Sequence, residues 1–269
     1  MSIWKLGRMQ LFSACALALL STMLLAQPSQ DDSSDSVRTP RDMAPVDLTG
    51  TWVSVIAEDW RYRMVTPPLG ELHGLPLNDA AQEIMNAWDP AADEAAGLAC
   101  KGYGAPNLMR LPGRARISWE DESTLKIEYD TGEQTRLLHF DGTPPADQER
   151  SWQGYSVAEW VSAPNMPRGI GFGPGQAQAP VAVPTGPLKI ITTNLREGYL
   201  RKNGIPLSEN AGLTEYIIRR TDIVSGDEWL SLVSVVDDPA YLTGTFIRSS
   251  EFRKEADDSM WSPRPCSAR

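Results

Sequence analysis

The chain has 269 residues, a length that suits one large domain or two small ones. Charged residues make up 22% of it and hydrophobic residues 41%, which is the balance of an ordinary globular protein. Its formal net charge of −10 argues against nucleic acid or an anionic membrane surface as a partner.

The first 26 residues have the pattern of a secretory signal peptide. Lys5 and Arg8 give a positively charged start, Leu11 to Leu25 form an apolar stretch, and Ala26 is a suitable last residue. The apolar stretch is short and quickly followed by polar residues, which disfavours a spanning helix, although a retained anchor is the alternative. Removal of the segment changes the net charge from −10 to −12. We therefore predict a periplasmic or secreted protein with no stable membrane span after signal removal.

Two cysteines remain beyond that segment, Cys100 and Cys266. In an exported protein an even pair favours a disulfide, and closing a loop of this length contributes very roughly 5 kcal/mol by loss of chain entropy. Neither cysteine has another cysteine or a histidine near it. The chain has only His73 and His139, and it has no Asp-rich calcium loop. We therefore expect no metal and no other cofactor.

Residues 27–46 are polar and rich in Ser, Asp and Pro, so they are predicted to be a disordered linker. The folded domain is expected to span 47–269. It opens with a strand from Asp47 to Val55, in which Gly50 is followed two residues later by Trp52. This start is similar to that of lipocalin-like barrels.

Charged and aromatic residues alternate from Glu58 to Met64, which predicts an extended segment with two different faces. One face would carry Asp59, Arg61 and Arg63, and the other would carry the aromatic side chains. The aromatic face belongs to the core in one interpretation. In a barrel with a polar lumen, the arginine face points inward instead.

One clear helix is predicted from Asn78 to Ala87, where Asp79 and Gln82 form a capping-box pattern. Asp89-Pro90 ends this helix and starts a second short one, which Gly97 closes. We expect the two helices to lie across one mouth of a sheet structure.

The stretch from Arg114 to Phe140 predicts a meander of three short strands, because apolar and polar side chains alternate between two turns. The Pro/Gly-rich stretch 164–187 is predicted to be a surface loop. An all-β, antiparallel, lipocalin-like barrel with a short two-helix insertion fits best, and a β-sandwich is the alternative. The further predicted strands cover 151–160, 188–193, 213–219, 228–236 and 245–254, and Asn203-Gly204 marks a tight turn.

Short motifs cover most of the chain after residue 47, among them LTGTW, EDWRYRM, NAWDPA, CKGYG, SWQGYSVAEW, DDPAYLTGTF and WSPRPC. Together they resemble a large family of exported, mostly uncharacterised bacterial proteins. The resemblance implies export and a β-rich, lipocalin-like fold. It brings no catalytic residues to this chain, and the stretch 164–187 looks like an insertion.

The leading functional hypothesis is a barrel that binds a small, partly apolar ligand in its lumen or mouth. Aromatic walls with a few hydrogen-bonding groups are the usual composition of such a site, and loops at a barrel mouth commonly carry recognition. The oligomeric state is left open. The candidate ligand-binding residues are Asp59, Arg61, Arg63, Arg114, Trp152, Tyr199 and Arg201.

A cofactor-free hydrolase or isomerase is the competing hypothesis. His139, Glu159 or Glu215 would then act as the base, with an arginine stabilising the developing negative charge. An outward-facing side chain is the alternative for His139. A third hypothesis is an interaction module without a pocket. Convergence of Arg61, Arg63 and His139 on one cavity would favour binding or catalysis over this third hypothesis.

Overall fold

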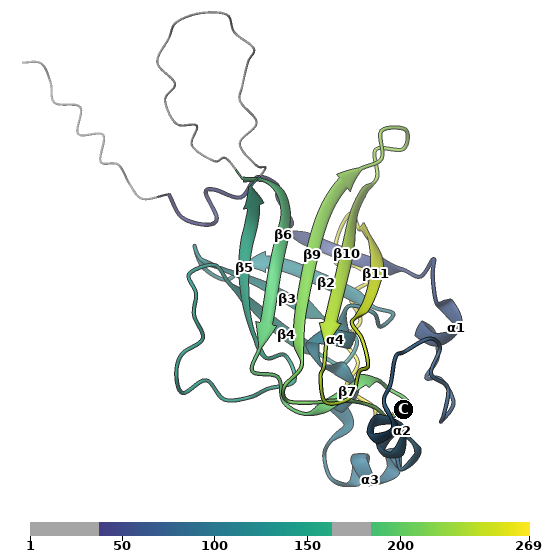
Figure 1. The fold of residues 1–269 in the computed structure, drawn as a ribbon. Coiled ribbons are helices and arrows are strands. Elements are labelled where there is room, and N and C mark those ends of the chain that lie inside the picture. Colours follow the sequence, from purple (N-terminus) through teal and green to yellow (C-terminus); the bar gives the residue numbers. More distant parts are fainter. Residues whose placement is uncertain (1–37, 163–183) are drawn as a thin grey trace, which may run out of the picture. The chain divides into compact units, whose positions relative to one another are not determined.

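The computed structural model describes residues 38–162 and 184–269, which belong to one compact unit, Arg38–Arg269. Nine strands of this part close into a barrel in the order β1-β11-β10-β9-β6-β5-β4-β3-β2 (Figure 1). The predicted all-β barrel with a short helical insertion is confirmed. The predicted signal peptide, residues 1–26, lies outside the described residues.

The bounds of the elements follow the predicted alternation closely in the second half of the chain. The barrel strands are β1 (Gly50–Val55), β2 (Arg114–Trp119), β3 (Thr124–Tyr129), β4 (Gln134–His139), β5 (Tyr155–Ser162), β6 (Pro184–Thr193), β9 (Gly212–Thr221), β10 (Glu228–Asp237) and β11 (Phe246–Lys254). A separate two-stranded sheet consists of β7 (Gly198–Arg201) and β8 (Ile205–Leu207). The helices are α1 (Trp60–Arg63), α2 (Asp79–Asn86), α3 (Pro90–Ala95), the 3-10 helix η1 (Ala99–Tyr103) and α4 (Ala105–Leu108).

One strand pair in the barrel is parallel. A ring of nine strands cannot alternate in direction all the way round, because an odd number leaves one pair pointing the same way. That pair is β4 and β5, in which Leu138 lies opposite Ser156 and His139 opposite Val157. The sequence predicted an antiparallel barrel, and this pair is the correction to it.

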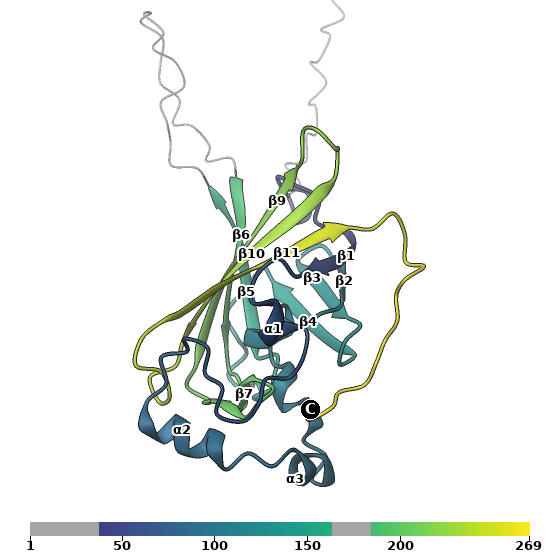
Figure 2. The same cartoon turned by 90° about the vertical axis from the view of Figure 1, so that its right-hand side faces the viewer.

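The helices α2 and α3 lie at one end of the barrel beside the β7-β8 sheet, away from the β9-β10 hairpin (Figure 1). α1 lies beside the barrel, at its right in Figure 1 and in front of it in Figure 2. The cap of α2 is Asn78, which accepts a hydrogen bond from the Ala81 amide, rather than the predicted Asp79. Asp89 caps α3 as predicted. Within the described ranges no helix is long and apolar enough to span a membrane.

Parts of the segments predicted to be irregular are described. Residues 38–46 include a turn in which the Met43 amide donates to Thr39 O, and the Arg41 amide donates to Glu122 O, 3.1 Å away. They therefore lie against the turn between β2 and β3. β6 begins at Pro184, so the last residues of the predicted loop 164–187 belong to a strand.

Buried apolar side chains form two clusters, one inside the barrel and one at its end beside α2 and the small sheet. The first includes Trp52 on β1 and Ile127 on β3, together with the inward side chains of the meander. The second includes Leu200 on β7 and Phe246 on β11, and it packs toward α2 and the small sheet. Packed side chains thus cover the inner face of the barrel strands.

A layer of buried polar side chains separates the two clusters. Arg136 and Glu215 form an ion pair at its centre, with side chains that are only 2% and 1% exposed. Arg136 also donates to Ser156 Oγ at 3.0 Å and to Thr192 Oγ1 at 2.7 Å, and these two hydroxyls are 2.9 Å apart. Pairing and hydrogen bonds of this kind offset the free-energy cost of burying the two charges. The layer consists of Arg136, Ser156, Thr192, Glu215, Ser234 and Ser250.

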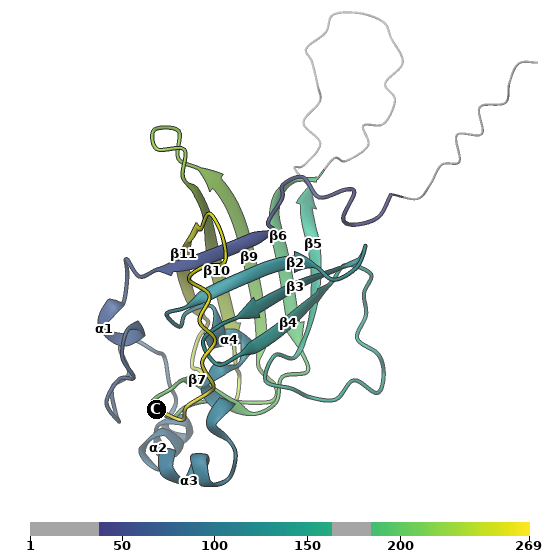
Figure 3. The same ribbon diagram turned by 180° about the vertical axis from the view of Figure 1, so that it is seen from behind.

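The predicted disulfide between Cys100 and Cys266 is confirmed. It joins η1 to the segment that follows β11, and Figure 3 shows this segment passing along the outside of the barrel. The Gly132 amide donates to Arg264 O in the same segment, 2.8 Å away. A disulfide of this kind is typical of proteins in oxidising compartments.

Candidate functional site

A cavity of about 120 Å³ lies between α1, the segment around α4 and the end of β7. No carboxylate of the described chain is among its lining residues, whereas four cationic side chains are. The chemistry of the cavity is therefore that of a site for negative charge. The side chains that matter most are Tyr62, Arg63, Tyr103, Arg110, Arg201 and Lys202.

The segment before the cavity folds as a helical turn. α1 spans Trp60–Arg63, so the prediction of an extended segment from Glu58 to Met64 is wrong. Residues two apart share a face in a strand but lie on nearly opposite sides of a helix. Consequently Arg63 is buried at the cavity, whereas Arg61 is exposed to solvent.

Asp59 lies outside the cavity lining and forms ion pairs with two nearby arginines. Its carboxylate contacts His73 Nε2 at 2.9 Å, Arg110 at 3.0 Å and Arg248 Nε at 3.4 Å. Burial alone would raise its pKa, but the hydrogen bond to His73 and the charges of Arg110 and Arg248 lower the pKa overall. Asp59 and His73 both have positive φ, at 50° and 43°. Such backbone conformations are uncommon outside glycine and gather at functional sites.

Arg63 presents unused donors to the cavity. Its side chain is 3% exposed, and Nε donates to Arg110 O at 2.9 Å. Among the described residues, neither terminal nitrogen has a hydrogen-bond partner. The nearest carboxylate oxygen, on Glu58, is 3.6 Å from one of them. A buried guanidinium left in this condition destabilises the protein, and burial lowers the pKa of Arg63.

Arg110 and Arg201 are also buried cations, although of these two only Arg201 has a terminal nitrogen without a partner in the described chain. Burial and the charge of Arg63 lower the pKa of Arg110 to about 10. Burial and the charge of Arg248 lower the pKa of Arg201 to about 10. Arg201 donates to Leu72 O at 3.0 Å, but its other terminal nitrogen has no partner in the described chain. An anion placed among these groups would supply both the missing acceptors and the missing charge.

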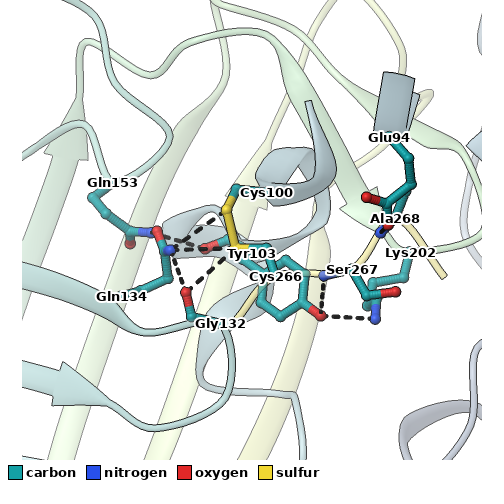
Figure 4. The surroundings of a disulfide bond; sticks show 10 residues. All are labelled: Glu94, Cys100, Tyr103, Gly132, Gln134, Gln153, Lys202, Cys266, Ser267 and Ala268. Carbon is teal, nitrogen blue, oxygen red and sulfur yellow. Dashed lines mark hydrogen bonds between the residues drawn. A yellow bond between two sulfur atoms is a disulfide. The ribbon is translucent and has the colours of Figure 1, made fainter. Parts of the chain in front are cut away.

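Lys202 and Tyr103 form the wall of the cavity nearest the disulfide (Figure 4). Lys202 Nζ donates to the Tyr103 hydroxyl at 2.9 Å and to Arg269 O. The Ser267 amide donates to the same hydroxyl at 3.2 Å. The segment that Cys266 anchors therefore fixes two side chains of the cavity wall.

The cavity unites a part of the predicted ligand-binding set. Arg63 and Arg201 line it, and Asp59 contacts Arg110 just behind its wall. Arg61, predicted on the same face as Arg63, points away.

The other predicted ligand-binding residues have partners elsewhere. Arg114 makes two hydrogen bonds with Glu255, at 2.8 and 3.1 Å, which raise its pKa. Trp152 Nε1 donates to Glu197 O at 3.3 Å. The Tyr199 hydroxyl donates to Asp93 at 2.7 Å, and its pKa is raised by burial and by this contact. None of these three side chains lines the cavity.

The three predicted catalytic residues lie apart from the cavity and from one another. His139 stacks on Tyr155, with ring centroids 4.5 Å apart, on the opposite face of β4 from the buried Arg136. Glu159 is exposed and pairs with Lys189 at 2.8 Å. Glu215 is enclosed in the interior layer. Arg61, Arg63 and His139 thus do not converge, since only Arg63 reaches a cavity.

Arg110 and Tyr103 line the cavity but were not among the residues predicted for the site. Arg110 carried a usable signal, because it is a single charge within the apolar run Leu108-Met109-Arg110-Leu111. A charge in such a run is expected either to be exposed or to serve a site.

Comparison of the chain with models of protein families, with curated proteins and with solved structures found no match. The family resemblance stays a prediction. Among residues 38–162 and 184–269, no group of three or more His, Cys, Asp or Glu side chains could hold a metal ion. Function must therefore be inferred from the cationic cavity.

Proposed function

We propose that this chain is an exported, periplasmic or secreted barrel protein that binds a small organic anion in the cavity beside β7. The observation that carries the proposal is the convergence of Arg63, Arg110 and Arg201 on one cavity that no described carboxylate lines. Planar guanidinium groups bind carboxylate, sulfate or phosphate through two parallel hydrogen bonds. Tyr62 and Tyr103 add flat apolar surface for the rest of the molecule.

Binding is favoured over catalysis by the character of the side chains at the cavity. The lining supplies cations, hydroxyls and apolar groups, but no histidine or carboxylate that would act as a general base. The two carboxylates beside its wall are already in use: Asp59 contacts His73 and Arg110, and Glu58 accepts a hydrogen bond from Ser249 Oγ at 2.9 Å. The lining residues can therefore bind a negatively charged group without any rearrangement.

Replacement of Arg201 by methionine is expected to weaken sulfate binding by about 10- to 100-fold, because a buried charged hydrogen bond contributes roughly 1.5–3 kcal/mol. Isothermal titration calorimetry with sulfate measures this effect. Arg61→Met is the matched control, since it removes the same charge from an exposed position on α1. Equal losses in both variants, or no sulfate binding by the native protein, would refute the proposed site.

Sulfate affinity is also expected to fall as the pH rises above about 10. Arg110 and Arg201 have pKa values of about 10, below the ordinary value of 12.5, so the folded protein loses these charges earlier than the unfolded chain. The cationic cavity is therefore complete below about pH 10 and is lost above it. Sulfate keeps its charge throughout this range. Titrations near pH 7, 9 and 11, with circular dichroism to confirm folding, test the prediction; unchanged affinity at the highest pH would contradict it.

A further inference from the structure

A second hollow of about 350 Å³ adjoins the cationic cavity. Thr66 and Pro67 line both spaces, so the two share a wall. The two spaces are also linked by a hydrogen bond. Lys202, which lines the first cavity, donates to the backbone oxygen of Arg269, which lines the second hollow. The side chains that give the second hollow its apolar character are Pro67, Pro68, Leu69, Trp88 and Pro90.

The segment between the two spaces exposes large apolar side chains. Met64 is 55% exposed, Val65 65% and Leu69 50%. Single exposed apolar residues are ordinary, but three within six positions beside two hollows form a continuous apolar rim. Here we call residues 64–69 the rim segment.

The rim segment and the residues after it are held in place from the protein side. The buried Asn203 donates through Nδ2 to Pro68 O at 3.1 Å and to Glu71 O at 3.0 Å. Arg201 donates to Leu72 O at 3.0 Å. These bonds fix the backbone by its carbonyls, so the exposure of the apolar side chains is built into the fold.

We propose that the ligand is an amphiphile, with an anionic head among Arg63, Arg110 and Arg201 and an apolar tail that crosses the rim segment into the second hollow. This inference rests on the proposed function and specifies the class of anion. The charge of the head sets the orientation, because four cationic side chains line the first cavity, whereas the second hollow is lined mainly by apolar side chains with Arg269 as its one charged lining residue in the described chain.

The volumes agree with this division. One water molecule takes up about 30 Å³ of liquid, so the first cavity of about 120 Å³ suits a carboxylate or sulfate head. The hollow of about 350 Å³ has room for a tail of roughly ten carbon atoms, if each takes a similar volume. A longer tail would extend into solvent and gain nothing further.

The test is a titration of the whole protein with acetate, hexanoate and decanoate. Affinity is expected to increase along the series by about two- to fourfold for each added methylene, as expected for buried apolar surface. Leu69→Asn changes a half-exposed side chain and should reduce this increase while leaving acetate affinity unchanged. Arg201→Met should weaken all three ligands by the same factor. Decanol, which has the tail without the charge, should bind far more weakly than decanoate.

Trp88 provides an independent readout of where the tail lies. A bromine atom quenches a nearby indole, so decanoate brominated at its far end should quench the native protein more than Trp88→Phe, which keeps an aromatic ring in the hollow. Equal quenching in both proteins, or equal affinity for acetate and decanoate, would overturn the amphiphile while leaving the anion site intact. Absence of binding by sulfate and all carboxylates would overturn both proposals.

Discussion

Replacing Arg136 by methionine is expected to lower the free energy of unfolding by about 3–5 kcal/mol, because it leaves the Glu215 carboxylate buried without its partner. Both side chains are almost wholly enclosed, and the same guanidinium also satisfies Ser156 and Thr192. Desolvated groups that lose a partner suffer the full penalty of burial, because water cannot reach them.

Urea denaturation of two single variants and the double variant would measure the interaction free energy between Arg136 and Glu215. Glu215→Leu should be about as damaging as Arg136→Met, and the double variant should lose less than the sum, since no unpaired charge remains. Lys189→Met is the matched control. Its partner Glu159 is on the outer surface of β5 and is 63% exposed, so this loss should be at most about 1 kcal/mol. A similar small loss for Arg136→Met would show that the interior layer is not a tight ion pair.

The architecture could be predicted because its information is local. Each meander strand alternates largely between buried and more accessible residues, and the turns between the strands have their own sequence signals. The parallel pair β4-β5 was not visible in this way. It follows from closure of the ring and from the connection between β4 and β5. The alternation of side chains along one strand reports which face is buried, but not the direction of the neighbouring strand.

The alternation of the strands also indicates the interior polar layer. Arg136 is two residues from Leu138, and Glu215 stands between Leu213 and Ile217, so alternation places both charges on buried faces. Two opposite charges on buried faces of a small barrel favour a pair. Glu215 was instead predicted as a candidate base, a role that its pairing with the buried Arg136 does not support.

The cavity was only partly predictable, because its members come from distant segments. Arg63 contacts the backbone of Arg110 across 47 residues of chain, and Arg201 comes from β7 of the small two-stranded sheet. Arg63 was chosen from an alternation that the structure does not have, and the helical turn then separated it from Arg61. No pattern of period two or 3.6 reports on contacts between loops, which depend on the tertiary fold.

Replacing Cys100 and Cys266 together by serine is expected to lower the free energy of unfolding by about 5 kcal/mol, the chain-entropy value for a loop of this length. The cysteines are 166 residues apart, so the bond constrains most of the unfolded chain. Domains are commonly stable by only about 5–15 kcal/mol, and the loss should therefore be a large share of the total. Urea denaturation of the variant, compared with the native protein with and without a dithiol reductant, measures it.

The same variant separates an entropic effect from a local one. If the bond acts mainly by restricting the unfolded chain, the contacts of Ser267 with Tyr103 and of Ala268 with Glu94 persist in the folded variant, and sulfate affinity stays near its native value. If the bond is what holds the segment in place, Lys202 loses its contact with Arg269 and sulfate affinity changes. A fall in the free energy of unfolding of less than about 1 kcal/mol would contradict both alternatives. The disulfide would then neither restrict the unfolded chain to the expected extent nor be needed to hold the segment in the folded protein.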